Sequence, residues 1–261
     1  MSGLKYISIT FLCVIMLSGC GKPSKQVDLN NNINLGDGVK MEFVKISAGS
    51  FQMGSNSGDS DEKPIHRVTL TKPFWMAKTE VTQTQWKQIM GNNPSRFKGD
   101  QNPVEQVSWN DAMKFCKKLT EREQQAGRLP QGWIYTLPTE AQWEYACRAG
   151  TTGKYAGNLD EMAWYKSNSG DKTHAVGMKQ PNAWGLYDMH GNVWEWCLDR
   201  YGKYPSGSVT DPSGPSSGSN RVFRGGGWGI NASNCRSANR GYYSPEFTYS
   251  GLGFRPVLVQ K

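Results

Sequence analysis

The sequence predicts a single compact α+β domain, from residue 41 to residue 261, with little regular secondary structure. Three observations point to this class. Short stretches that alternate between polar and apolar residues come first, and stretches with helical spacing follow. After Gly150, Gly, Asn, Ser, Pro, Tyr and Trp dominate, with few long periodic runs. The chain also contains 10 Trp, which favours a core built from large aromatic side chains.

Four short strands are expected in the first part of the domain. They cover residues 41–46, 50–53, 66–70 and 74–78. Turn-forming residues separate the members of each pair, and the polar stretch SNSGDSDEKP between the two pairs is expected to be an exposed loop.

Three helices are expected next, over residues 82–90, over residues 108–125 and from residue 139 onward. In the second helix, apolar residues recur at offsets of three and four, which places them on one face. In the third, Thr139 and Gln142 have the spacing of a capping box, in which each side chain satisfies a free backbone N–H of the first turn.

The N-terminus has the layout of an export signal. Residues 1–19 contain one basic residue, Lys5, and then an apolar run that is too short to span a bilayer. The stretch Leu17-Ser18-Gly19-Cys20 resembles a bacterial lipobox, which implies cleavage before Cys20 and a lipid on that residue; an ordinary signal peptide is the alternative. Residues 20–40 are polar and Asn-rich, so we expect a lipidated Cys followed by a flexible tether. These features predict a protein of the bacterial cell envelope that faces the periplasm, and Gly21 favours the outer membrane.

Charge and cysteine content narrow the choice of partners. The formal net charge is +8 at pH 7, but the basic residues are scattered, so no nucleic-acid partner is expected. Four Cys remain after Cys20, namely Cys116, Cys147, Cys197 and Cys235. An even number in an exported protein favours disulfides, although four Cys allow three pairings.

Three long motifs resemble the formylglycine-generating enzyme (sulfatase-modifying factor) family. They are LPTEAQWEYACRAG (residues 137–150), NAWGLYDMHGNVWEW (residues 182–196) and RVFRGGGW…CRSANR…LGFRP (residues 221–256). The resemblance implies the family's fold, which is related to that of C-type lectins. Members of the family include copper oxidases that convert a sulfatase Cys to formylglycine, iron-dependent sulfoxide synthases, non-catalytic paralogues and envelope accessory proteins, so fold alone does not decide function.

The same resemblance argues against the copper chemistry. Copper-dependent members hold Cu(I) between two Cys thiolates that lie five positions apart, and soft thiolates suit that ion. Counted from the glycine-rich turn, the first position falls on Ile230 and the second can fall on Cys235. Gly227 and Gly251 depart from the family pattern as well. Copper is therefore not expected, and Cys235 is left as a lone candidate for a catalytic thiol.

The resemblance also implies structural roles for the cysteines. Cys197 and Cys235 are expected to form a disulfide, because the two are expected to occur together in this family. Cys116 and Cys147 lie on the apolar faces of two helices, so they either form a second disulfide or are packed as free thiols.

The second motif implies a calcium site. In family members a calcium ion is held by a side chain at the position of Asp188, by carbonyl groups at the positions of Gly191 and Val193, and by a carboxylate at the position of Glu195. The alternative is that Glu195 pairs with an Arg. The three His are far apart in the sequence and do not suggest a metal site of their own.

Two tryptophans are candidates for the walls of a ligand groove. The resemblance places Trp194 and Trp228 at positions that face a bound peptide in active members, and core packing is the alternative. Arg236, Arg240 and Arg255 are expected to hold loops through hydrogen bonds to carboxylates or backbone.

These observations lead to two functional hypotheses. The first is an envelope lipoprotein whose domain binds a partner protein, peptide or glycan without redox chemistry. The second is a formylglycine-generating or related metal-dependent oxidase that acts on a protein or a small thiol.

Overall fold

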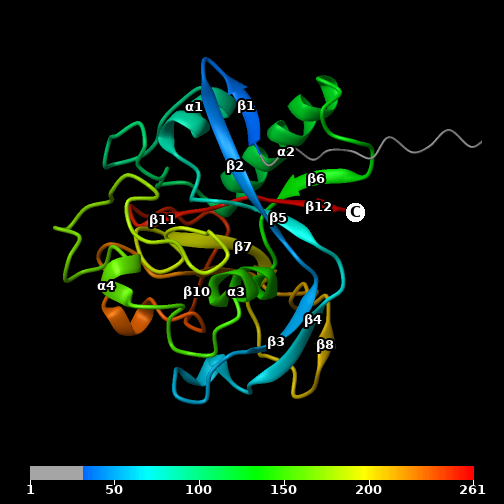
Figure 1. Cartoon of the computed structure of the whole chain (residues 1–261), viewed down its shortest axis with the longest axis vertical. Coiled ribbons are helices and arrows are strands. Elements are labelled where there is room, and N and C mark those ends of the chain that lie inside the picture. The colour runs from blue at the N-terminus through cyan, green and yellow to red at the C-terminus, as the bar shows by residue number, and fades with distance from the viewer. Residues whose placement is uncertain (1–31) are drawn as a thin grey trace, which may run out of the picture.

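The computed structural model describes residues 32–261, and within this part it forms one mixed α+β domain with curled sheets (Figure 1). The predicted fold class is confirmed. The predictions for the signal peptide, residues 1–19, and for lipidation at Cys20 lie outside the described residues. None of the helices within residues 32–261 is long and apolar enough to cross a membrane.

A five-stranded antiparallel sheet forms one side of the domain (Figure 1). In spatial order its strands are β1 (Asn32–Gly36), β2 (Val39–Ile46), β5 (Phe74–Ala77), β12 (Val257–Gln260) and β6 (Trp133–Thr136). The sheet therefore joins the beginning of the domain to its end, because β12 inserts between β5 and β6.

Two smaller sheets complete the β structure. One contains β3 (Gly49–Met53), β4 (His66–Leu70) and the short β8 (Val209–Thr210). The other contains β10 (Arg240–Tyr243), β9 (Arg221–Arg224), β7 (Trp194–Arg200) and β11 (Leu252–Gly253), with β10 at one edge. In this last sheet β11 runs parallel to β7 and the other pairs are antiparallel.

The three predicted helices are present. They are α1 (Gln83–Met90), α2 (Trp109–Gln125) and α3 (Glu140–Arg148), and a single turn, α4 (Leu159–Met162), follows. Thr82, Ser108 and Thr139 cap the three longer helices, each within a capping box, so the predicted helix starts differ by one residue at most. Helix α2 packs against β6 at the edge of the large sheet, and it lies above β6 in Figure 1.

The predicted tether is wrong over its last part. Residues 32–36 form β1, which pairs with β2, and Ile33 and Leu35 are buried while their neighbours are exposed. This alternation is the signature of a strand with one buried face. The Asn-rich composition of the stretch concealed it in the sequence.

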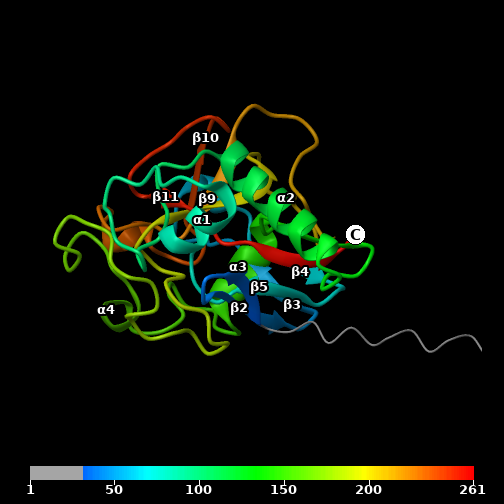
Figure 2. The same ribbon diagram turned by 90° about the horizontal axis from the view of Figure 1, so that it is seen from above.

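The segment between α3 and β7 has little regular structure, as the composition after Gly150 predicts. Both views show it as long loops on one side of the molecule, with α4 among them (Figure 1, Figure 2). Aromatic residues are among the largest side chains of the apolar core: Trp143, Trp196, Phe74, Phe115 and Phe254 are all fully buried.

Candidate functional site

The glycine-rich turn after β9 is required by close packing. Gly225 and Gly226 both have positive φ, and a Cβ on Gly226 would lie 2.5 Å from the Sγ of Cys235. Side chains rarely tolerate either condition. The turn therefore brings the backbone against Cys235 and shields its thiol.

Cys235 is not accessible for chemistry. Its exposed fraction is 0%, and it packs with Ala163 and Tyr165 in a small cluster of its own. Burial raises the pKa of the Cys235 thiol to about 12. A reactive Cys needs the opposite shift, because the thiolate is the nucleophile and the metal ligand.

The predicted disulfides are absent. Cys116, Cys147, Cys197 and Cys235 are all free and buried. Cys197 packs in a different apolar cluster from Cys235, and Cys116 in a different one from Cys147, so neither predicted pair shares a cluster. Each of the four Cys behaves as a small apolar side chain. The even number of Cys in the sequence could not show this.

A group of buried ion pairs lies where β9, β10 and α3 meet. We name Arg148, Arg224, Arg240, Glu140 and Glu144 the arginine cluster. Arg224 bridges Glu140 and Glu144, Arg148 lies 2.7 Å from Glu144, and Arg240 contacts both oxygens of Glu140 at 2.6 and 2.8 Å. Burial alone would raise the pKa of Glu140, but the charges of Arg240 and Arg224 lower it. The cluster therefore favours the ionised form of Glu140 and ties three segments together.

A second buried group contains an excess of acids. We name Glu80, Asp188, Glu195 and Arg255 the acidic cluster. Arg255 forms a two-point contact with Glu195 at 2.6 and 2.7 Å, and Glu80 accepts hydrogen bonds from Asn192 and from the backbone of Val193. Asp188 accepts one from the N–H of Gly177 through Oδ2, while its Oδ1 is buried without a partner.

The pKa values of Glu80 and Asp188 are both raised, as expected for buried carboxyl groups with too little positive charge beside them. Burial, reinforced by Asp188 and Glu195, raises the pKa of Glu80 well above its usual range. Burial raises the pKa of Asp188 to about 6, against the hydrogen bond from Gly177 and the charge of Arg255. A single guanidinium does not compensate three carboxyl groups in a low-dielectric site.

This arrangement fits a cation in part. The unpaired Asp188 Oδ1 is a free hard-oxygen donor, and added positive charge would stabilise Asp188 and Glu80 as anions. Glu195 is already engaged by Arg255 and by the indole N–H of Trp143, as the alternative in the sequence predicted. Within residues 32–261 no three His, Cys, Asp or Glu side chains gather closely enough to hold a metal by themselves. Calcium would therefore depend on the carbonyl groups of Gly191 and Val193 as well.

The predicted groove lacks one of its walls. Trp194 is 7% exposed and packs edge-on against Phe223, so it belongs to the core. Trp228 is half-buried, donates its indole N–H to the carbonyl of Ser250 at 2.9 Å and packs edge-on against Phe97.

The predicted roles of Arg236, Arg240 and Arg255 in holding loops are confirmed, because all three pair with buried carboxylates.

A set of exposed aromatic residues was missed by the sequence reasoning. We name residues 242–249 the tyrosine segment; Tyr242, Tyr243 and Tyr249 are 45%, 51% and 37% exposed. Tyr242 stacks on Tyr201, and Tyr243 stacks on Phe247, each with ring centroids 3.8 Å apart. The segment begins on the edge strand β10. The available signal was a high density of aromatics without any apolar period.

The fold and its buried charges define an α+β domain in which buried ion pairs join α3 to β9 and β10 and join β7 to Arg255. The chain belongs to the sulfatase-modifying factor enzyme 1-like family, whose domain matches residues 37–259. The family resemblance seen in the motifs is thus confirmed.

Sequence comparison finds relatives with different names. The chaperone protein LppX of Paenibacillus barcinonensis is 33% identical over 262 residues, which cover 82% of this chain and 87% of that protein. The formylglycine-generating enzyme of Mus musculus is 33% identical over 84% of this chain, and the match spans 65% of the mouse protein. About a third of the mouse enzyme thus has no counterpart in the match.

Solved structures agree with the fold. The variable protein 1 of Treponema denticola is 35% identical and superimposes with a TM-score of 0.81, over 88% of this chain and 98% of that one. PvdO from Pseudomonas aeruginosa is 27% identical, with a TM-score of 0.73 over 89% and 98% of the two chains.

Proposed function

We propose that this chain is a lipid-anchored protein of the bacterial cell envelope that binds a partner protein through the tyrosine segment and does not carry out the copper-dependent oxidation of its enzyme relatives. The observation that carries the proposal is a contrast within one stretch of chain. Between Gly225 and Gly251 the thiol of Cys235 is hidden, while the tyrosines are presented to solvent.

The thiol chemistry supports the non-oxidase part. A two-thiolate Cu(I) site needs a second sulfur beside Cys235, and the equivalent position is the half-buried Ile230. The other three described Cys are buried in other apolar clusters. Forming a thiolate at Cys235 would also require ionising a group whose pKa is raised to about 12.

The tyrosine segment supports a protein partner. Tyr side chains supply large contact area with few rotatable bonds, and they are enriched at protein interfaces. They lie next to an edge strand, whose free backbone groups can accept a further strand. The relative named a chaperone protein is consistent with a protein as partner. A peptide or a glycan remains an outcome of the test below.

The lipobox-like stretch Leu17–Cys20 supports the lipid anchor.

A calcium ion would have a structural role in this protein. The ion would be held by Asp188 and Glu195 together with the carbonyl groups of Gly191 and Val193, between the loop-rich segment and β7. There it would supply the positive charge that the acidic cluster lacks.

Photo-crosslinking tests the binding role. A benzoyl-phenylalanine at Tyr243 in the full chain, expressed in cells, should crosslink to one defined protein, and the same group at the exposed Lys118 of α2 should not. Changing Tyr242 and Tyr249 to Ser should abolish the product. Equal products from both positions, or a product unaffected by the Ser changes, would contradict binding at this segment; a crosslinked glycan would replace the protein partner.

The oxidase is the second candidate, and the similarity to enzymes named formylglycine-generating favours it. Cu(I) titration against a chromophoric chelator separates the two. We expect no stoichiometric complex, and no change on Cys235→Ser. A tight one-to-one complex that is lost in Cys235→Ser, with conversion of a sulfatase-derived Cys peptide, would establish the oxidase instead.

A further inference from the structure

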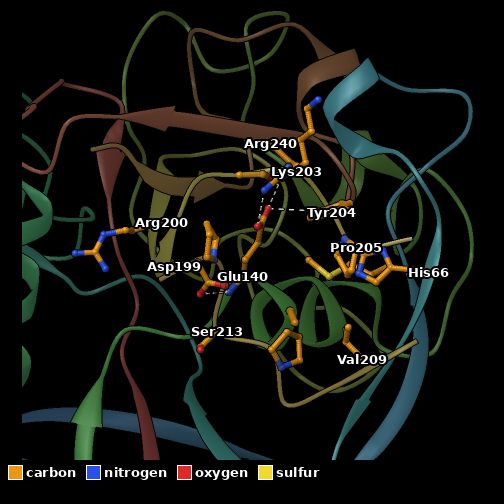
Figure 3. A pocket seen from close by; sticks show the side chains of 16 residues that line it. His66, Glu140, Asp199, Arg200, Lys203, Tyr204, Pro205, Val209, Ser213 and Arg240 are labelled. Carbon is orange, nitrogen blue, oxygen red and sulfur yellow. Dashed lines mark hydrogen bonds and ion pairs between the residues drawn. The ribbon is translucent and has the colours of Figure 1, made fainter. Parts of the chain in front are cut away.

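A pocket of about 320 Å³ lies beside the arginine cluster, and Glu140, Ala141 and Arg240 of the family motifs form part of its wall. It is enclosed by β4, the N-terminus of α3, the end of β7 and the loop between β7 and β9. Figure 3 shows Asp199 and Ser213 on one side of this pocket and His66 and Pro205 on the other. Its size is sufficient for a small molecule, and nothing in the proposed binding role uses it.

The walls of the pocket are largely apolar. Met53, Ala141, Val209 and the prolines of the loop contribute carbon surface, and Tyr204 adds an aromatic ring. The ring of Tyr204 is held in place, because His66 packs against it with centroids 4.8 Å apart and the Arg240 guanidinium lies 4.1 Å from it. A ligand with an apolar face would find a rigid surface here.

Two hydrogen-bonding atoms in the pocket wall are unsatisfied. Asp199 is 4% exposed and accepts the backbone N–H of Glu140 through Oδ2 at 2.9 Å, but its Oδ1 receives no hydrogen bond from residues 32–261. His66 is 5% exposed, and its Nδ1 lies 3.0 Å from the carbonyl oxygen of Pro64. Because a carbonyl only accepts, Nδ1 carries a proton, and in that tautomer Nε2 is an acceptor. Both residues line the pocket, so each of these atoms can form a hydrogen bond with a ligand there.

The wall of the pocket carries charges of both signs, which favours a neutral ligand. Both oxygens of Glu140 are occupied by Arg240, and one also accepts from Arg224 and from the hydroxyl of Tyr204. Arg200, Lys203 and Arg240 line the same pocket as Glu140 and Asp199, so an added cation meets basic groups and an added anion meets carboxyl groups. A neutral ligand avoids both costs.

We propose that this pocket binds a neutral, hydroxyl-rich small molecule about the size of one sugar ring. Its hydroxyl groups donate to His66 Nε2 and pair with Asp199 Oδ1, and its apolar face packs on Tyr204 and the prolines. Burial and the charge of Glu140 raise the pKa of Asp199 to about 8, so this carboxyl is present in both forms near neutral pH. A hydroxyl satisfies either form, because it donates to the carboxylate and accepts from the protonated acid.

Saturation-transfer NMR on the purified domain-containing chain tests the proposal with methyl glycosides of glucose, galactose, mannose and N-acetylglucosamine at millimolar concentration. Butylamine and benzoate serve as charged probes. We expect transfer to the ring protons of at least one glycoside and none to the charged probes. No transfer to any of the four glycosides, or stronger transfer to a charged probe, would overturn the proposal.

Variants locate the binding within the chain. Pro212→Trp places an indole in the pocket without touching its polar atoms and should abolish transfer. His66→Phe keeps the ring against Tyr204 but removes the acceptor, so the dissociation constant should rise about tenfold, and Asp199→Val should act likewise while Asp199→Asn retains binding. Tyr243→Ser should leave glycoside binding unchanged, which separates this pocket from the tyrosine segment. Transfer that survives in Pro212→Trp would show that the glycoside binds elsewhere and would contradict the proposal.

Discussion

The arginine cluster and the acidic cluster are two solutions to burying charge in one small domain. The first sets three guanidinium groups against two carboxylates, and the second sets three carboxyl groups against one guanidinium. In the first, Glu140 has a lowered pKa, whereas in the second, Glu80 and Asp188 have raised ones. The difference shows that the arginine cluster is compensated by protein groups, while the acidic cluster needs either protons or an added cation.

The strongest test of this difference between the two clusters is to replace the central arginine of each one. Arg224→Met leaves Glu140 and Glu144 with fewer partners in a fully buried site, so the free energy of unfolding in urea should fall by about 3–5 kcal/mol. Arg255→Met should be at least as damaging in the presence of a chelator, and calcium should restore part of the loss only in Arg255→Met.

The control for that pair is an exposed ion pair of the same chain. Lys117 lies 3.8 Å from Glu121 on α2 with both side chains largely exposed. Lys117→Ala should leave the free energy of unfolding unchanged within error, because exposed pairs contribute little. A large loss in this variant, or none in Arg224→Met, would break the comparison.

Calcium should stabilise the protein through the acidic cluster alone. At a concentration of about 100 times its dissociation constant, calcium should raise the free energy of unfolding by about 2.7 kcal/mol at pH 7. Calorimetry of the wild type and of Asp188→Asn measures this, and the variant should lose the effect because it lacks the anionic Oδ1. A calcium effect of the same size in both proteins would place the ion elsewhere.

Without calcium, the contribution of Asp188 to stability should decrease as the pH rises. The pKa of Asp188 is raised from 3.8 to about 6 in the folded protein, so its contribution is fully present below about pH 4 and is lost as the pH rises through about 6. Glu80 acts in the same direction. Glu62, Glu140 and His190 act in the opposite direction, because their pKa values are lowered. The measurement is therefore the difference in the free energy of unfolding between the wild type and Asp188→Asn, in urea with chelator, which should decline by about 2 kcal/mol over this range. A difference that stays constant or grows with pH would mean that the cluster is compensated after all.

The smallest effect is expected from reduction. Cys197 borders the arginine cluster, and its thiol is free. A reducing agent should therefore leave the melting temperature unchanged, whereas loss of a native disulfide costs about 2–5 kcal/mol. Mass spectrometry of the alkylated, unfolded protein should find all four Cys modified without prior reduction.

Local patterns allowed much of the fold to be predicted. The capping boxes at Thr82, Ser108 and Thr139 are short-range signals, and the structure has helices at all three. Strand β1 was missed because its polar positions are Asn, which composition assigns to loops, although Ile33 and Leu35 alternate with them. For this strand the alternation of apolar and polar residues is a better guide than composition, because burial depends on the face of the sheet that a side chain occupies.

The site was harder to predict because it depends on long-range placement. Glu80 and Asp188 are more than a hundred positions apart, and no spacing rule joins them to Arg255. The cysteine pairing failed for the same reason, since an even count says nothing about which thiols share a cluster. Aromatic content predicted an aromatic core, but it did not distinguish the buried Trp194 from the exposed Tyr243.

The position of β12 has a consequence for synthesis. Strand β5 can pair with β2 as soon as both are made, but its other edge and β6 pair with β12, so the sheet cannot be completed before Val257 is translated. Pairings this distant in sequence form slowly, because a long loop must close first. The large sheet of the nascent chain therefore stays incomplete until its last strand is translated.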